Sequence, residues 1–145
     1  MICLEKLEFD EGRDCIKKLI ALVLALVCAF GLIGCGKQAD PIVIPAADEI
    51  DSINITTFDN SEITLSDKEW IEQIVDILTN TETTTKESVQ DIPNVENYGK
   101  VDISYNNKIS TIFYYTEKGK HYIEQPYQGI YVADVDIDVF IKGIE

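Results

Sequence analysis

The sequence has few of the residues that carry metal or nucleophilic chemistry. It contains one histidine, His121, and four cysteines, the last of which is Cys35. One histidine cannot supply the usual zinc ligands, and no thiol follows Cys35 to act as a nucleophile or to pair in a disulfide. A Ser–His pair would have to use His121, which lies beside a predicted turn. We therefore expect no catalytic residues and no cofactor.

Basic residues are also scarce. The chain has 12 Lys and Arg against 26 Asp and Glu, and its formal net charge is −14. Residues 1–34 hold 4 of the basic and 5 of the acidic residues, which leaves 8 basic and 21 acidic residues, a net charge of −13, in the remainder. Such a field repels polyanions, so the composition excludes a nucleic-acid partner.

One long uncharged segment is present, residues 19–33 (LIALVLALVCAFGLI), directly after Lys17 and Lys18. It is shorter than the roughly 20 residues that an ordinary transmembrane helix needs. A basic pair, a short apolar run and then small residues are typical of a secretory signal. The run ends in Leu32-Ile33-Gly34-Cys35, which resembles the lipobox of bacterial lipoproteins.

The lipobox resemblance implies that Cys35 receives a diacylglycerol and, after cleavage, becomes the first residue of a lipoprotein with acyl chains such as palmitate. We therefore expect residues 1–34 to be a lipoprotein signal peptide and the protein to be anchored at the outer face of the cytoplasmic membrane. Residues 1–16 carry a net charge of −3, which opposes the usual charge asymmetry of a signal. We interpret them as a misassigned translation start. Residues 35–49, with Pro41 and Pro45, are predicted to be the lipidated cysteine and a tether.

Residues 50–145 predict a single α+β domain: a small antiparallel sheet of about five strands, one amphipathic helix packed on it and a short C-terminal helix. Alternating apolar residues predict strands over 50–57, 61–66, 100–106, 108–117 and 121–125. A capping-box pattern at Ser66 opens the main helix, whose apolar stripe runs from Trp70 to Leu78. Residues 79–99 are predicted to form a long connector, which its length alone makes a candidate site.

The last stretch, DVDIDVFIKGIE, fits both a strand and a helix. We expect a short helix capped by Asp134 or Asp136. An alternative is a calcium loop, because Asp134, Asp136 and Asp138 have its one-three-five spacing and Glu145 falls at position twelve. Val139 stands where such a loop needs glycine, so these three aspartates are only weak calcium candidates.

Two segments of the folded part, ESVQDIPNVENYGKVDISY and YYTEKGKHYIEQPYQGIY, carry a family resemblance. They resemble a domain of unknown function found in small lipoproteins of Gram-positive bacteria (Firmicutes, often clostridial), in which ESVxDxPN and YIEQPYxGIY recur. The resemblance covers residues 50–142. It implies a lipid-anchored, extracytoplasmic α+β domain and carries over no activity.

These two motifs also supply the candidate site. Pro126 and Gly129 suit a tight bend, and the tyrosines can bury their rings while their hydroxyls reach polar partners. We expect Glu124 to accept a hydrogen bond from the ESVQDIPN connector. The complete candidate set is Glu87, Ser88, Asp91, Pro93, Asn94, Tyr122, Glu124, Gln125, Pro126, Tyr127, Gly129 and Tyr131.

Two interpretations of this set stay open: a structural corner that satisfies its own polar groups, and a patch that recognises an envelope protein or peptide. The sequence therefore predicts a non-catalytic binding, sensing or accessory protein. An envelope enzyme or enzyme inhibitor is one alternative, and a calcium-dependent adhesion module is the other.

Overall fold

The computed structural model of the chain describes residues 17, 18, 20, 21 and 36–144. It divides into two compact units, Met1–Gly36 and Lys37–Glu145, of which the second holds the sheet. The predicted leader, Cys35 and Glu145 fall outside the described residues. Within the described part of the chain, no helix has both the length and the apolar character needed to cross a membrane.

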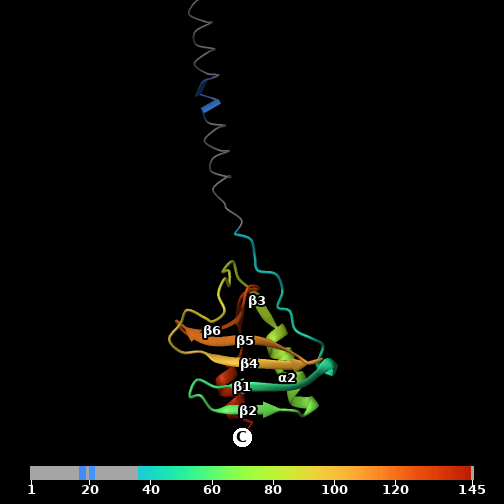
Figure 1. Cartoon of the computed structure of the whole chain (residues 1–145). Coiled ribbons are helices and arrows are strands. Elements are labelled where there is room, and N and C mark those ends of the chain that lie inside the picture. Colours follow the sequence, from blue (N-terminus) through green and yellow to red (C-terminus); the bar gives the residue numbers. More distant parts are fainter. Residues whose placement is uncertain (1–16, 19, 22–35, 145) are drawn as a thin grey trace, which may run out of the picture. The chain divides into compact units, whose positions relative to one another are not determined.

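A single seven-stranded antiparallel sheet organises the folded unit (Figure 1). Its strand order is β2-β1-β4-β5-β6-β7-β3. The strands are β1 (Ile50–Thr56), β2 (Glu62–Leu65), β3 (Thr81–Thr83), β4 (Gly99–Tyr105), β5 (Lys108–Glu117), β6 (Lys120–Gln125) and β7 (Gly129–Ala133). The helices are α2 (Lys68–Thr79) and α3 (Ile137–Lys142), preceded by the short 3-10 helix η1 (Ala47–Glu49).

The sheet has two more strands than the five or so that the sequence predicts, so that strand count is wrong. Of the two additional strands, β7 pairs with β6 from Gln125↔Gly129 to His121↔Ala133, and β3 pairs with β7 at the sheet edge. β3 has the polar sequence Thr-Glu-Thr and carries no strand pattern of its own, whereas β7, Gly-Ile-Tyr-Val-Ala, has strand-forming residues that were not assigned to a strand from the sequence. The α+β class and the remaining five strands are confirmed.

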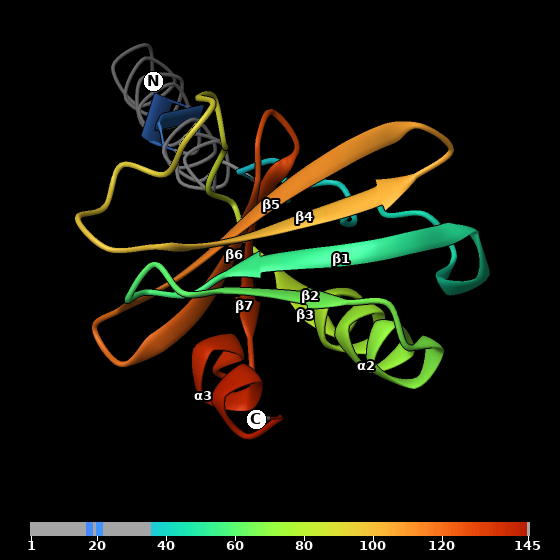
Figure 2. The ribbon, with the colours of Figure 1, turned by 60° about the horizontal axis from the view of Figure 1, so that its bottom comes forward.

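The core lies on one face of the sheet, beneath both helices (Figure 2). Ile53 and Ile55 of β1 are fully buried on this face, as their alternation predicts. Ile50 joins them because the pairing with β4 shifts between Ile50 and Ser52, which takes Asp51 out of the alternation. The helices add Ile71, Ile74 and Leu78 from α2 and Ile137 and Ile141 from α3. Each of these side chains contributes about 1.5–3 kcal/mol on burial.

Aspartates cap both helices. The α2 helix begins after Asp67, whose carboxylate accepts the Glu69 amide at 2.9 Å, so the predicted cap at Ser66 is one residue too early. The α3 helix begins after Asp136, whose carboxylate accepts the amides of Asp138 and Val139. The helical interpretation of the C-terminal stretch is therefore confirmed, with Asp136 as its cap.

Candidate functional site

The site is built around the β6–β7 hairpin. The Gln128 amide donates to the Gln125 carbonyl at 3.0 Å and closes the turn that contains Pro126 and Tyr127. Tyr127 has a φ of 60°, a left-handed conformation that glycine or asparagine adopts more readily. The hairpin therefore presents a tyrosine at a strained turn position.

Gln125 holds the segment that precedes the first strand. Its side-chain oxygen accepts the Val43 amide at 2.8 Å, and its side-chain nitrogen donates to the Val43 carbonyl at 2.7 Å. A buried amide side chain thus pairs with one residue of backbone as a neighbouring strand would. We call residues 37–46 the strap.

Further contacts fix the strap along the hairpin. The Tyr131 hydroxyl donates to the Asp40 carbonyl at 2.7 Å, and the Ala39 amide donates to the Thr84 carbonyl at 2.8 Å. Gly129 lies so close to Ala39 that a Cβ added to the glycine would come within 2.6 Å of the Ala39 Cβ. The structure therefore differs from the predicted tether over 35–49. Hydrogen bonds hold this segment against the hairpin although it contains two prolines, and the folded unit begins at Lys37.

A second clasp holds the connector. Ser88 donates to a Glu124 carboxylate oxygen at 2.7 Å, and both side chains are buried. This confirms the predicted hydrogen bond between the two motifs. Burial, and second the neighbouring Glu124 carboxylate, raise the pKa of Tyr115. Glu124 therefore joins the connector to the face of the sheet opposite the helices.

The exposed side of the site differs from expectation. Tyr131 is fully buried as predicted, but 67% of Tyr127 is exposed and its hydroxyl donates to Asp91 at 2.7 Å. The prediction that all three tyrosines bury their rings is therefore wrong. Tyr122 is half-buried, stacks on Tyr115 at 5.5 Å between ring centroids and has the Lys86 amine 4.7 Å above its ring. Of the remaining candidates, Pro93 is buried whereas Glu87 and Asn94 are exposed.

The three aspartates proposed as calcium ligands lie in different environments. Asp138 is buried and accepts hydrogen bonds from the Phe58 amide at 2.9 Å and from the Lys142 amine at 2.7 Å. This contact raises the pKa of Lys142. Asp136 caps α3, and Asp134 is exposed. The described residues contain no group of three or more potential metal ligands.

His121 lies near both a hydroxyl and a carboxylate. Its Nδ1 is 3.1 Å from the Thr116 hydroxyl and 3.7 Å from an Asp136 carboxylate oxygen. A catalytic relay needs the acid on one ring nitrogen and the nucleophile on the other. Here both groups approach the same nitrogen, so this arrangement does not activate the hydroxyl.

A cleft of about 530 Å³ opens between the connector and the β1–β2 turn. Phe58 and Phe113 supply aromatic surface, and Tyr98 packs edge-on against Phe113 with ring centroids 5.4 Å apart. Its polar lining includes Asn60, Glu62, Glu96, Asn97 and Lys100. This cleft is larger than a cavity of about 80 Å³ that Lys86 and Glu87 of the connector also border.

Sequence reasoning identified neither the strap nor the cleft as parts of a site. The strap depends on contacts between residues 45 to 91 positions apart, which no local pattern encodes. The cleft combines three separate segments of the chain, and the only signal for it was the length of the connector.

The chain belongs to the family DUF5301, described as "Domain of unknown function (DUF5300)", whose model matches residues 38–132. It is also similar to a solved structure described as the "NMR structure of the protein from Ruminococcus gnavus". That structure has 37% sequence identity and a TM-score of 0.61, and the match covers 67% of this chain and 95% of that chain. No curated protein matches the chain. The predicted membership of a domain-of-unknown-function family is thus confirmed.

The buried connector clasp yields a stability prediction. Ser88→Ala leaves Glu124 without one of its buried donors and should lower the free energy of unfolding by about 1–3 kcal/mol. Tyr127→Phe is the matched control, because it removes an exposed hydrogen bond between the same two segments and should change stability by less than about 0.5 kcal/mol. Urea denaturation measures both. Equal losses of unfolding free energy in the two variants would contradict a special contribution of the buried Ser88–Glu124 hydrogen bond.

The strap clasp yields a second prediction. Gln125→Ala removes both hydrogen bonds to Val43 and should cost about 2–3 kcal/mol while making residues 37–46 sensitive to protease. Gln128→Ala, whose side chain makes only a 3.4 Å contact with the Pro41 carbonyl, should leave stability and cleavage close to wild type. Limited proteolysis with mass spectrometry locates the cuts. A strap that is cleaved equally fast in the wild type would show that it is not docked.

Proposed function

We propose that this protein is a lipid-anchored, non-catalytic binding domain at the outer face of the cytoplasmic membrane. The observation that carries the anchoring is the start of the folded unit at Lys37, two residues after the cysteine of the Leu-Ile-Gly-Cys motif. Only Gly36 separates them, and one extended residue spans at most about 3.6 Å. A diacylglycerol on Cys35 supplies the two acyl chains that stable anchoring requires. The domain would then sit against the bilayer without a spacer.

The two clasps support a structural role for the motif residues. Ser88, Glu124, Gln125 and Tyr131 direct their polar atoms at other parts of the same domain. A ligand that used these atoms would first have to break buried hydrogen bonds. The structural-corner interpretation is therefore favoured for this hairpin, and recognition is assigned to the cleft.

The cleft has the chemistry of a site for a peptide segment. Aromatic surface from Phe58, Tyr98 and Phe113 suits apolar side chains, and the amides of Asn60 and Asn97 can pair with a peptide backbone. The net charge of −13 beyond residue 34 favours a neutral or basic partner over an acidic one. We assign the partner to an envelope protein or peptide, bound without any covalent step.

No specific observation favours either alternative function, the envelope enzyme or enzyme inhibitor and the calcium-dependent adhesion module. An envelope enzyme would have to use His121, whose two neighbours share one ring nitrogen. An enzyme inhibitor would bind through the same surfaces as any other binding protein. A calcium-dependent adhesion module would have to recruit Asp136 and Asp138 away from their helix cap and their lysine.

The anchor is tested by lipid labelling in cells. The wild type should incorporate a radiolabelled fatty acid and have a mature mass that begins at an acylated Cys35, whereas Cys35→Ser should incorporate none. Cys28→Ser removes a thiol from the apolar run and should be labelled like the wild type. An unlabelled wild type, or equal labelling of Cys35→Ser, would contradict the anchor.

The cleft is tested by site-specific photo-crosslinking in the envelope. A photoreactive amino acid at Glu96, which lines the cleft, should give a discrete adduct, whereas the same group at the exposed Glu72 of α2 should give none. The adduct should decrease when Tyr98→Ala removes aromatic surface from the cleft. Identical adduct patterns from the two positions, or no adduct from either, would refute recognition through the cleft.

A further inference from the structure

Three large apolar side chains are exposed on the hairpin turn and on the connector beside it. The exposed fractions are 70% for Val89, 55% for Ile92 and 67% for Tyr127. The hydrogen bond from Tyr127 to Asp91 joins the turn to the connector between the two aliphatic residues. We call Val89, Ile92 and Tyr127 the apolar tip; Ile92 also lines the edge of the cleft described above, so the tip and the cleft adjoin at this residue.

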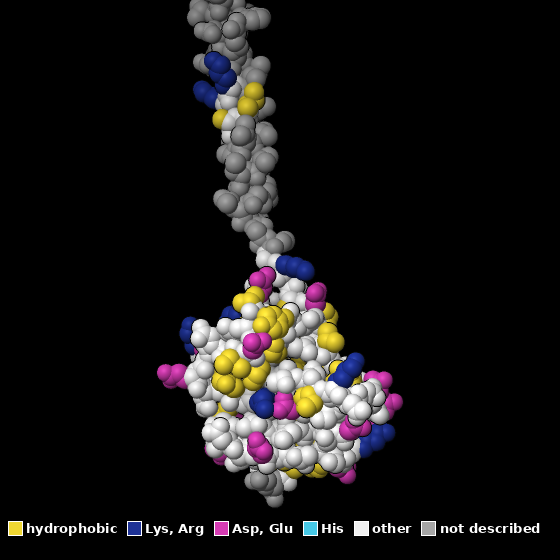
Figure 3. Space-filling model, in the orientation of Figure 1, with side chains coloured by type: hydrophobic (Ala, Val, Ile, Leu, Met, Phe, Trp, Pro, Cys, Tyr) yellow, Lys and Arg dark blue, Asp and Glu magenta, His cyan; other side chains and the backbone are white. Residues whose placement is uncertain are grey.

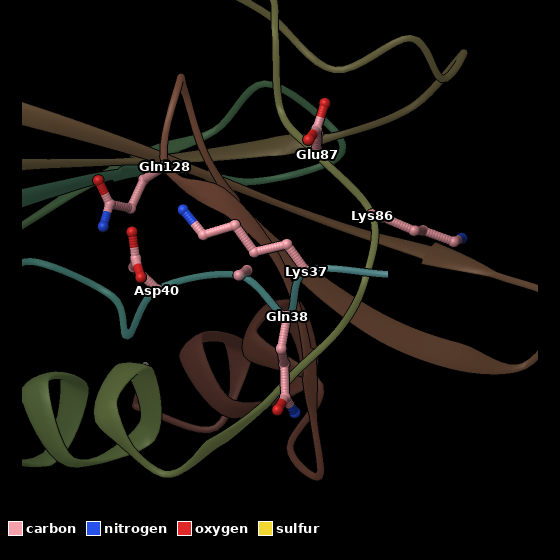
Figure 4. Close-up of a pocket in the computed structure, with 7 residues that line it drawn as sticks. Lys37, Gln38, Asp40, Lys86, Glu87 and Gln128 are labelled. Atoms are coloured by element: carbon pink, nitrogen blue, oxygen red, sulfur yellow. The ribbon is translucent and has the colours of Figure 1, made fainter. Parts of the chain in front are cut away.

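The apolar tip lies beside the start of the strap. Lys37 shares a small cavity of about 80 Å³ with Lys86 and Glu87 of the connector and Gln128 of the hairpin (Figure 4). Figures 1 and 2 agree that the strap start, the connector and the β6–β7 turn gather at one end of the sheet. In Figure 3, apolar side chains cluster in the upper half of the domain.

We propose that the apolar tip inserts into the headgroup region of the bilayer that holds the Cys35 lipid. This inference rests on the proposed lipid anchor, and it adds an orientation that the anchor alone does not give. Because one residue separates Cys35 from the strap, the end of the domain that carries Lys37 must stay at the bilayer surface. The side chains that this end exposes are of the kind that enter the interface: aliphatic residues and a tyrosine with a polar hydroxyl.

Charge and backbone geometry agree with an apolar contact. Around the tip, Lys37 and Lys86 are outnumbered by Asp40, Glu87 and Asp91, so electrostatic attraction to anionic lipid does not supply the contact. Tyr127 keeps its ring exposed at a φ of 60°, where glycine would cost less conformational energy. Strain retained at an exposed aromatic residue points to a contact outside the domain.

The test attaches residues 35–145 to vesicles through Cys35, which is the only thiol in that segment, by a maleimide phospholipid. Because the match covers 95% of the Ruminococcus gnavus chain, a protein of little more than this domain folds by itself. Val89→Trp and Ile92→Trp report on the tip. Ile109→Trp is the matched control, since Ile109 is 68% exposed beside the β4–β5 turn. The emission of the protein without these substitutions is subtracted, because the native Trp70 also fluoresces.

The vesicles contain brominated phosphatidylcholine, which quenches tryptophan in the membrane. Val89→Trp and Ile92→Trp should show a blue-shifted emission and at least about twofold stronger quenching than Ile109→Trp. High salt should change the quenching little, and added phosphatidylglycerol should not increase it, because the domain carries a net charge of −13. Equal quenching at all three positions, or none at the tip, would overturn the orientation, and loss of tip quenching in high salt would show electrostatic adsorption instead. Because the lipid is attached chemically, failure here is separate from failure of lipid labelling in cells.

Discussion

The hydrogen bonds that the β6–β7 hairpin makes to the strap, from the Gln125 side chain to Val43 and from the Tyr131 hydroxyl to Asp40, determine where the folded unit begins. Without them the strap would be a flexible extension with two prolines, and the domain would hang from the predicted lipid by about fifteen residues of loose chain. With them the domain starts two residues after Cys35. The same hairpin also holds the connector on the opposite face of the sheet, through Glu124 and Ser88. One hairpin thus fixes the two segments that lack helices and long strands.

This arrangement separates structural residues from those free to act outside the domain. Alternate residues of β6 serve opposite faces of the sheet: Gln125 holds the strap on the helix side, and Glu124 holds the connector on the other side. Their polar atoms are used within the domain. The surfaces available for contacts outside the domain are the cleft beside the connector and the apolar tip. A ligand in the cleft and a membrane at the tip would therefore contact the same connector, which makes it the segment most able to couple binding to membrane position.

The sequence predicted those features whose cause is local. The apolar stripe of α2 and the aspartate cap of α3 follow from neighbouring residues alone. The bond between Glu124 and the connector was also predictable, because the two motifs needed mutual partners. By contrast, β3 is polar and exists only because β7 offers it an edge. The docked strap could not be predicted, because prolines favour a tether and the opposing contacts come from residues 45 to 91 positions away.

Amide hydrogen exchange of residues 35–145, followed residue by residue by NMR, tests the docked strap most directly. If the hairpin holds the strap, the amides of Ala39 and Val43 exchange slowly, because they donate to Thr84 and Gln125, and the amide of Gly36 exchanges at the rate of an unstructured peptide. If Ala39 and Val43 exchange as fast as Gly36, the strap is not part of the fold, and a close attachment of the domain to the membrane is contradicted.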